Sequence, residues 1–427
     1  MADDKKNQLV RRPGSELDTP GRQASRVRQG MTRDVLARAK AQDVSSARFR
    51  IGGYLLREPD YRQVLRWAEA GGIGPEEVLQ KLSGAVVEPP YWDELLIEPI
   101  AFSMEDGAMI SVPWDFDLLP FIPDSWEPGL LIREIGFRKT WEKTRATTSA
   151  NLRPNLPMLK VLSCVHVSLE ELDLSKVPNL TSLICVGNNL SDIDLTPVPR
   201  LITLSCTSDQ LSKLDLSPVP RLVKLNIRAS KLSELNLSSV PKLTMLRCVS
   251  ELLDELDLSP VPRLRELDCG ACSISELDLS PVPELTKLDI SFSSISKLDL
   301  TPVPGLTDLD LEGYNLFGEG FLNELDLTPV PNLVTLNCSD NNFSELDLAP
   351  VPKLSKLYCG GNKLTNLDLT SVPRLTGLDC RWNDLFEIDL TPVPGLTELL
   401  CDKDLRVCNA PRGLKIDHRM NSYLSRQ

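Results

Sequence analysis

Cysteine and histidine are the residues best suited to chemistry in this 427-residue chain, and the positions of the cysteines indicate packing instead. Most of the eleven cysteines recur at one position of a repeating pattern, where other copies carry Ile227, Ile290 or Leu311. Exchange with Ile and Leu predicts a buried apolar column, in which unpaired Cys acts as a small hydrophobe. The cysteines at this position are Cys164, Cys185, Cys206, Cys248, Cys269, Cys338, Cys359, Cys380 and Cys401.

The remaining nucleophiles and metal ligands do not form a recognisable constellation. Cys269 and Cys272 make a CxxC, formally a redox or zinc motif, but Cys269 belongs to the apolar column. His166 and His418 are far apart in sequence, and residues 1–157 contain neither Cys nor His. Phosphate-binding glycine motifs are also missing. We therefore predict no enzyme activity, no cofactor and no metal, and keep an unrecognised carboxylate enzyme in 31–157 as an alternative.

Carboxylates recur as regularly as the cysteines, in the phrase Leu-Asp-Leu-Ser/Thr-Pro-Val-Pro. The step between copies is 21 residues, except for 27 residues between Asp299 and Asp326, and Asn236 fills one position. Such a column would repel itself unless each carboxylate accepted a hydrogen bond from its own Ser/Thr-Pro turn. Calcium between coils is the alternative. The column contains Asp173, Asp194, Asp215, Asp257, Asp278, Asp299, Asp326, Asp347, Asp368 and Asp389.

A second phrase, Leu-x-x-Leu-x-Cys-x-x-Asn-x-Leu, precedes each carboxylate phrase and is complete at Leu354, Leu357, Cys359, Asn362 and Leu364. Its alternating apolar residues predict a short strand, and such strands must stack to bury one face. The phrase resembles the leucine-rich repeat family, with repeats of bacterial style. We predict an α/β solenoid with a parallel concave sheet and short extended or 3₁₀ convex segments, after a small, mainly helical N-terminal region.

The repeats leave distinct segments at both ends of the chain. We expect a disordered basic tail over 1–30, a small helical region over 31–83, an acidic aromatic-rich N-terminal cap over 84–157, about 12 repeat coils over 158–404, and a C-terminal cap with a basic tail over 405–427. The cap region is alternatively a separate binding module. The insertion near 316–322 is either a tolerated surface loop or a partner contact.

The charge of the chain concentrates in the repeats. The net charge of the whole chain is −13, which disfavours general nucleic-acid binding. The residues between the core positions of the strands form an acidic strip with aromatic neighbours, suited to a basic protein or peptide, or simply a solvated face. The family resemblance implies recognition through the concave face. The candidate binding residues are Glu266, Asp268, Asp289, Phe292, Asp308, Asp310, Glu312, Tyr358, Asp379, Arg381 and Trp382.

These patterns together favour a non-enzymatic protein-binding scaffold. A ladder of unpaired thiols suits a reducing compartment, and the first 30 residues lack the apolar core of a secretory signal. No apolar run is long enough to span a membrane. We therefore expect a monomeric cytoplasmic solenoid with a protein or peptide partner, and no nucleic-acid or membrane partner. The alternative is a bacterial effector or surface factor, secreted by a non-classical route, that engages a host protein.

Overall fold

The computed structural model describes residues 48–87, 100–105, 108–115, 130–138, 150–313 and 322–418. By contacts the chain divides into two compact units, Met1–Leu201 and Ile202–Gln427. Within the described ranges, no helix is both long and apolar enough to cross a membrane. The predicted tail 1–30, residues 31–47 of the predicted helical region, most of the aromatic-rich flank, residues 316–321 of the insertion, and residues 419–427 lie outside the described residues.

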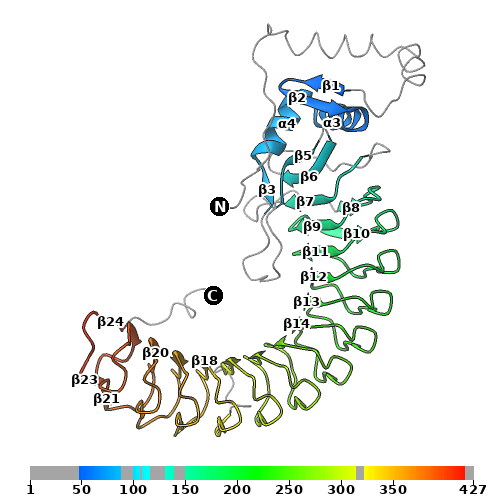
Figure 1. The fold of residues 1–427 in the computed structure, drawn as a ribbon. Coiled ribbons are helices and arrows are strands. Elements are labelled where there is room, and N and C mark those ends of the chain that lie inside the picture. The colour runs from blue at the N-terminus through cyan, green and yellow to red at the C-terminus, as the bar shows by residue number, and fades with distance from the viewer. Residues whose placement is uncertain are drawn as a thin grey trace, which may run out of the picture. The chain divides into compact units, whose positions relative to one another are not determined.

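The first unit opens with a hairpin and two helices (Figure 1). Strands β1 (Arg48–Ile51) and β2 (Tyr54–Arg57) pair antiparallel, an element that the sequence patterns did not predict. The helices α3 (Glu58–Gly71) and α4 (Pro75–Gly84) have proline in their first turns, where the missing N–H costs nothing. The helices pack together through apolar faces that bury Val64, Trp67, Val78, Leu79 and Leu82.

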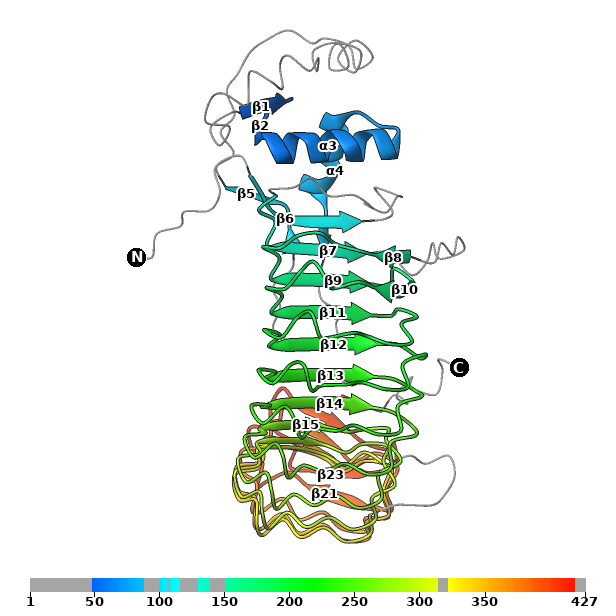
Figure 2. The same cartoon turned by 90° about the vertical axis from the view of Figure 1, so that its right-hand side faces the viewer.

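The rest of the first unit is built on a mainly parallel sheet in the order β5-β6-β7-β9-β11. Strand β5 runs antiparallel to β6, and the following pairs are parallel, with β6, β7, β9 and β11 side by side in Figure 2. The strands of this unit after the helices are β3 (Val86–Val87), β4 (Ile100–Ala101), β5 (Ser103–Glu105), β6 (Ala108–Asp115), β7 (Glu134–Arg138), β8 (Ala150–Leu152), β9 (Val161–Val165), β10 (Leu169–Leu172) and β11 (Ser182–Val186).

The second unit continues the same design as a solenoid with one short main-sheet strand per coil. Adjacent strands are parallel and paired in register, so that Leu267 faces Leu288 and Leu288 faces Leu309. The strands are β12 (Thr203–Thr207), β13 (Lys224–Arg228), β14 (Met245–Val249), β15 (Glu266–Asp268), β16 (Lys287–Asp289), β17 (Asp308–Asp310), β18 (Thr335–Asn337), β19 (Lys356–Tyr358), β20 (Gly377–Asp379), β21 (Glu387–Asp389), β22 (Glu398–Leu400), β23 (Arg406–Cys408) and β24 (Lys415–Asp417).

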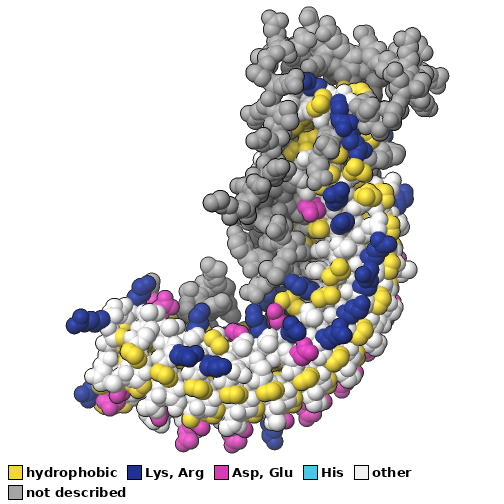
Figure 3. All heavy atoms as spheres, in the orientation of Figure 1, with side chains coloured by type: hydrophobic (Ala, Val, Ile, Leu, Met, Phe, Trp, Pro, Cys, Tyr) yellow, Lys and Arg dark blue, Asp and Glu magenta, His cyan; other side chains and the backbone are white. Residues whose placement is uncertain are grey.

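Each coil turns back through its Val-Pro phrase, as predicted. In the coil of β13, Val219 N–H donates to the Leu216 carbonyl and Leu222 N–H to the Val219 carbonyl, both at 3.1 Å. These consecutive three-residue turns are the short convex segments expected for a 21-residue repeat. The valine is fully buried in every such coil, and the cysteine column is also buried. Figure 3 shows the resulting regularity, with hydrophobic side chains in a line along successive coils of the second unit.

Asparagine side chains tie neighbouring coils together from inside. The Asn362 amide donates to the carbonyls of Cys338, Cys359 and Gly360 at 2.9–3.2 Å, and its oxygen accepts the Phe343 N–H at 3.1 Å. The equivalent residues Asn188, Asn341 and Asn383 make corresponding bonds. A single buried amide therefore satisfies backbone groups of successive coils that water does not reach.

Replacing Asn362 with Ala should destabilise the solenoid by about 1–3 kcal/mol, because it leaves buried backbone groups without partners. Urea unfolding followed by circular dichroism measures this loss. The matched control is Lys363→Ala, which alters an exposed neighbour in the same coil and should change the unfolding free energy little. Equal effects of the two substitutions would contradict the role given to Asn362.

A buried carboxylate connects the helices of the first unit to its sheet. Asp60 of α3 is fully buried and accepts the Met109 N–H of β6 at 2.9 Å, while Arg57 lies 3.7 Å away. Burial raises the pKa of Asp60 to about 6, and the Met109 hydrogen bond and Arg57 oppose this rise. The folded protein therefore ionises this group less readily than the unfolded chain does.

Because the pKa of Asp60 is higher in the folded state, its favourable contribution is complete at low pH and is lost as pH rises toward and through about 6. A rise of two pKa units corresponds to about 3 kcal/mol. Asp60→Asn cannot ionise, so the variant should lack this part of the stability loss between about pH 4 and pH 7.5. Urea unfolding across that range tests it, and identical pH profiles for both proteins would refute the assignment.

Candidate functional site

Each repeated Leu-Asp-Leu carboxylate accepts a hydrogen bond from the turn that follows it, as predicted. In each copy the carboxylate, or the amide oxygen of Asn236, accepts the backbone N–H two residues ahead at 2.8–3.0 Å. In Asp257 and Asp278, bonds from Ser259 and Ser280 lower the pKa of the carboxyl. Among the described residues, no group of three or more His, Cys, Asp or Glu is placed to hold a metal ion. We call this set the outer column.

A second line of carboxylates lies on the strands themselves. Asp268 of β15 pairs in register with Asp289 of β16, which pairs with Asp310 of β17. Strands in a sheet are about 4.8 Å apart, so three like charges lie close together. We call these three residues the acidic ladder. In each, one oxygen accepts the N–H two residues ahead, at 2.9–3.1 Å, and thereby closes the turn that follows the strand.

Among the described residues, an ion pair offsets the charge of the acidic ladder at one end. Arg247 Nε lies 2.7 Å from Asp268 Oδ2. At the other end, the Asn337 amide donates to Asp310 Oδ2 and to Glu312 Oε2, both at 3.1 Å. A neutral amide satisfies hydrogen bonds but does not neutralise charge.

Burial and neighbouring carboxylates raise the pKa values of three acids in and beside the acidic ladder. Burial, followed by the nearby Asp289 charge, raises the pKa of Asp268 to about 6, although Arg247 opposes it. Burial and Asp289 likewise raise the pKa of Asp310. Burial raises the pKa of Glu312, with further contributions from Asp310 and Asp340. Ionisation of Asp268, Asp310 and Glu312 is therefore less favourable than ionisation of the outer-column carboxylates.

The neighbouring line of strand residues is more balanced in charge. Lys287 stands in register between Glu266 and Asp308, so a cation separates these two carboxylates. Asp308 also accepts the Thr307 hydroxyl at 2.7 Å. Both acids were predicted binding residues, but the stronger uncompensated charge lies in the acidic ladder.

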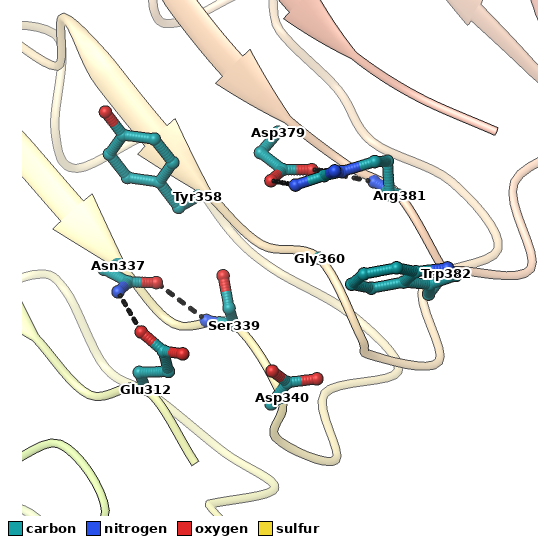
Figure 4. Close-up of a pocket in the computed structure, with 9 residues that line it drawn as sticks. All are labelled: Glu312, Asn337, Ser339, Asp340, Tyr358, Gly360, Asp379, Arg381 and Trp382. Atoms are coloured by element: carbon teal, nitrogen blue, oxygen red, sulfur yellow. Dashed lines mark hydrogen bonds and ion pairs between the residues drawn. The ribbon is translucent and has the colours of Figure 1, made fainter. Parts of the chain in front are cut away.

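A polar pocket of about 110 Å³ opens beyond the ladder, across β18, β19 and β20. Figure 4 shows its walls: Tyr358 on one side, Trp382 on another, and Glu312 and Asp340 along a third. We call this the terminal pocket. It is lined by Glu312, Asn337, Ser339, Asp340, Tyr358, Gly360, Asp379, Arg381 and Trp382.

One wall of the terminal pocket is a fixed ion pair. Arg381 Nε donates to Asp379 Oδ1 at 2.9 Å, and Arg381 Nη2 donates to Asp379 Oδ2. The Arg381 guanidinium also lies 5.1 Å from the centre of the Trp382 ring. Trp382 adopts a left-handed backbone with φ of 52°, and its backbone N–H donates to Asp402 Oδ2 at 2.8 Å. Trp382 is 44% exposed in this position.

The structure corrects the expected exposure of two predicted residues. Asp379 and Arg381 were predicted on the exposed concave face, but they are 8% and 3% exposed. The reason is their spacing: Arg381 follows the strand by two residues and folds back onto the carboxylate that closes the same turn. They form a wall of the pocket together with Glu312, Tyr358 and Trp382, whereas Phe292 lies outside the pocket lining.

Sequence patterns missed the other lining residues. Asn337 occupies the ladder position of its strand, where a neutral residue interrupts the acidic run. Asp340 adopts a left-handed backbone with φ of 54°, at the position that Gly361 fills in the next coil. A comparison of that position across coils would have shown Gly187 and Gly361 and so marked the turn.

The cysteine column does not add nucleophiles to this surface. Burial raises the pKa of Cys338 to about 12 and that of Cys401 to about 11, so both thiols stay protonated at neutral pH. Cys272, of the CxxC, is buried at the asparagine position and donates its S–H to the Cys248 carbonyl at 3.2 Å. The CxxC thus has a packing and hydrogen-bonding role that explains both of its cysteines.

Removing Arg247 should raise the pKa of Asp268 above its value of about 6, because Arg247 stabilises the ionised carboxylate. Asp289→Asn should lower it, since a repelling charge disappears. Carbon-13 NMR of labelled aspartate carboxyls measures both shifts for Arg247→Gln and Asp289→Asn. Arg265→Gln is the control, because Arg265 pairs with Glu284 instead; a pKa of Asp268 that moves equally in this control would contradict the assignment.

Comparisons with known proteins identify the repeat. No protein-family model matches the sequence, and no curated protein matches it. Among solved structures, the functional domain of InlJ from Listeria monocytogenes, which includes a cysteine ladder, is 32% identical with a TM-score of 0.52. The match covers 61% of this chain and 62% of the InlJ chain, so it spans less than two thirds of that protein.

Two more distant structures share the fold. The leucine-rich repeat protein LIC12759 of Leptospira interrogans is 17% identical, with a TM-score of 0.52 over 67% of this chain and 84% of its own. Toll of Drosophila, in its complex with Spätzle, is 17% identical, with a TM-score of 0.50 over 68% of this chain and 44% of that one. The 21-residue period, the stacked parallel strands and the buried cysteine column agree with these likenesses, and the chain has the solenoid fold of leucine-rich repeat proteins.

Proposed function

We propose that the protein is a non-enzymatic scaffold that binds a basic segment of another protein along the acidic ladder and the terminal pocket. The observation that carries this proposal is the in-register stack of Asp268, Asp289 and Asp310, in which Asp268 at one end forms an ion pair with Arg247. A partner that supplies cations would relieve the repulsion that raises the pKa of Asp268. Electrostatic complementarity of this kind favours both encounter and register.

The fold supports a protein partner over a small ligand. A row of strand residues offers an extended surface, and the terminal pocket of about 110 Å³ is smaller than the usual cavity for a drug-sized molecule, about 300–1,000 Å³. Toll, which shares the fold, is seen in complex with the protein Spätzle. Exposed aromatic side chains such as Trp382 are the residues that typically anchor protein interfaces.

The compartment proposed for this activity is a reducing one, such as the cytoplasm. All eleven cysteines are unpaired, and ten of them are buried. A protein built on stacked free thiols is suited to surroundings that keep thiols reduced.

The binding proposal is tested by removing the ladder charge without disturbing its turns. Asn keeps the oxygen that accepts the backbone N–H, as Asn337 does at the same position. The triple variant Asp268→Asn, Asp289→Asn, Asp310→Asn should weaken binding of a fluorescent Arg/Lys-rich peptide to the full chain by about tenfold or more, measured by anisotropy. Each tenfold loss is about 1.4 kcal/mol.

The outer column provides the matched control. Asp257→Asn, Asp278→Asn and Asp299→Asn remove the same charge from the same coils, and Asn236 shows that Asn is accommodated there. This control variant should weaken binding of the peptide by less than about twofold. Equal losses in the two triple variants would mean that net charge alone drives binding, and would overturn the proposed site.

A further inference from the structure

We propose that the terminal pocket seats a single arginine side chain of the bound partner, with the guanidinium lying between Tyr358 and Trp382 and facing Glu312 and Asp340. This inference rests on the function proposed above and specifies the partner's chemistry at one point of the surface. The acidic ladder would attract the basic segment, and the pocket would fix its register by accepting one particular residue.

The charges that line the pocket select a cation. Arg381, a cation in the lining, is already neutralised by its two bonds to Asp379, so the pair acts as a neutral wall. The remaining ionisable acids of the lining are Glu312 and Asp340. Glu312 is half-buried, and burial, followed by the nearby charges of Asp310 and Asp340, raises its pKa. A cation placed beside these carboxylates would stabilise both, whereas an anion would add to the repulsion.

The shape of the lining favours a guanidinium over an ammonium group. Figure 4 shows Tyr358 and Trp382 at opposite sides of the space, with the Asp379–Arg381 pair and Asp340 between them. Trp382 already supports one guanidinium, that of Arg381, at 5.1 Å. A planar guanidinium can stack on aromatic faces and also donate two parallel bonds to a carboxylate, while an ammonium group acts as a point charge.

The volume of the terminal pocket is suited to a single side chain. The pocket volume of about 110 Å³ is well below that of sites for drug-sized ligands, yet several times the roughly 10–15 Å³ of cavity that one water needs. The ion pair that forms one wall is buried, and Asp402 accepts the backbone N–H of Trp382, so the wall and the turn that carries Trp382 are formed before a partner arrives. A preformed seat reduces the ordering cost of binding.

The test uses the full chain labelled with 5-fluorotryptophan, in which six tryptophan resonances are expected and Trp382 is assigned by substitution. N-acetyl-arginine amide should shift the Trp382 resonance saturably. N-acetyl-citrulline amide, which has the same shape without the charge, should bind at least about tenfold more weakly, and N-acetyl-lysine amide should also bind more weakly. An equal response to citrulline, or tighter binding of lysine, would overturn the proposal.

Variants locate the response. Glu312→Gln retains an oxygen for the Asn337 bond but removes the charge, and it should weaken arginine amide by about fivefold or more. Phe386→Ala, which removes another exposed aromatic side chain of the same coil outside the pocket lining, should leave the titration unchanged. An unchanged affinity for arginine amide in Glu312→Gln, or a loss of affinity in Phe386→Ala, would refute the proposed arginine site in the terminal pocket.

The two proposals can fail separately. The triple ladder variant should lose affinity for the Arg/Lys-rich peptide while retaining a Trp382 shift with arginine amide. If arginine amide never shifts Trp382 but the ladder and outer-column variants still differ in peptide binding, the arginine seat is wrong and the proposed function stands. If those triple variants do not differ, the proposed function is wrong, whatever the pocket does.

Discussion

The stacking of identical coils is the constraint on which the rest of this structure depends. One 21-residue coil cannot bury its own Leu, Val and Cys side chains; burial is achieved only when the next coil covers them. Parallel strands paired in register then convert every position of the repeat into a column, as with Leu267, Leu288 and Leu309. Columns suit apolar residues, and they suit Asn362, which bonds backbone groups of successive coils. They are unfavourable for like charges, which are brought within about 4.8 Å of each other.

The protein contains two carboxylate columns that experience this constraint differently. Asp278 in the outer column and Asp289 in the acidic ladder each use one oxygen to accept a backbone N–H two residues ahead, so each has a structural role. The outer carboxylates are surrounded by solvent, and their turns lower the pKa of Asp278. On the strands, burial and neighbouring charge raise the pKa of Asp268. The same residue type in the same repeat thus has a lowered pKa at Asp278 in the outer column and a raised pKa at Asp268 in the acidic ladder.

Periodicity explains how much of this could be predicted from sequence. The strand positions, the Val-Pro turns, the buried cysteine column and the turn bonds of the outer aspartates all follow from the repeat, because each position has many equivalents. The burial of Arg381 against Asp379 does not follow, since it depends on how one side chain folds back at the end of one strand. The hairpin of β1 and β2 also lies outside the repeat and has no second copy to compare.

Several pocket residues depart from the repeat, and this has a physical meaning. Stacking requires residues that recur, and it does not require Tyr358 or Trp382, each of which occurs once at its position. Asp340 takes a left-handed backbone that Gly361 adopts at lower cost one coil later. Residues that stacking does not need, and that backbone strain disfavours, gather around one pocket. The repeated acids can attract many basic segments, so selection of one register requires the residues that are not repeated.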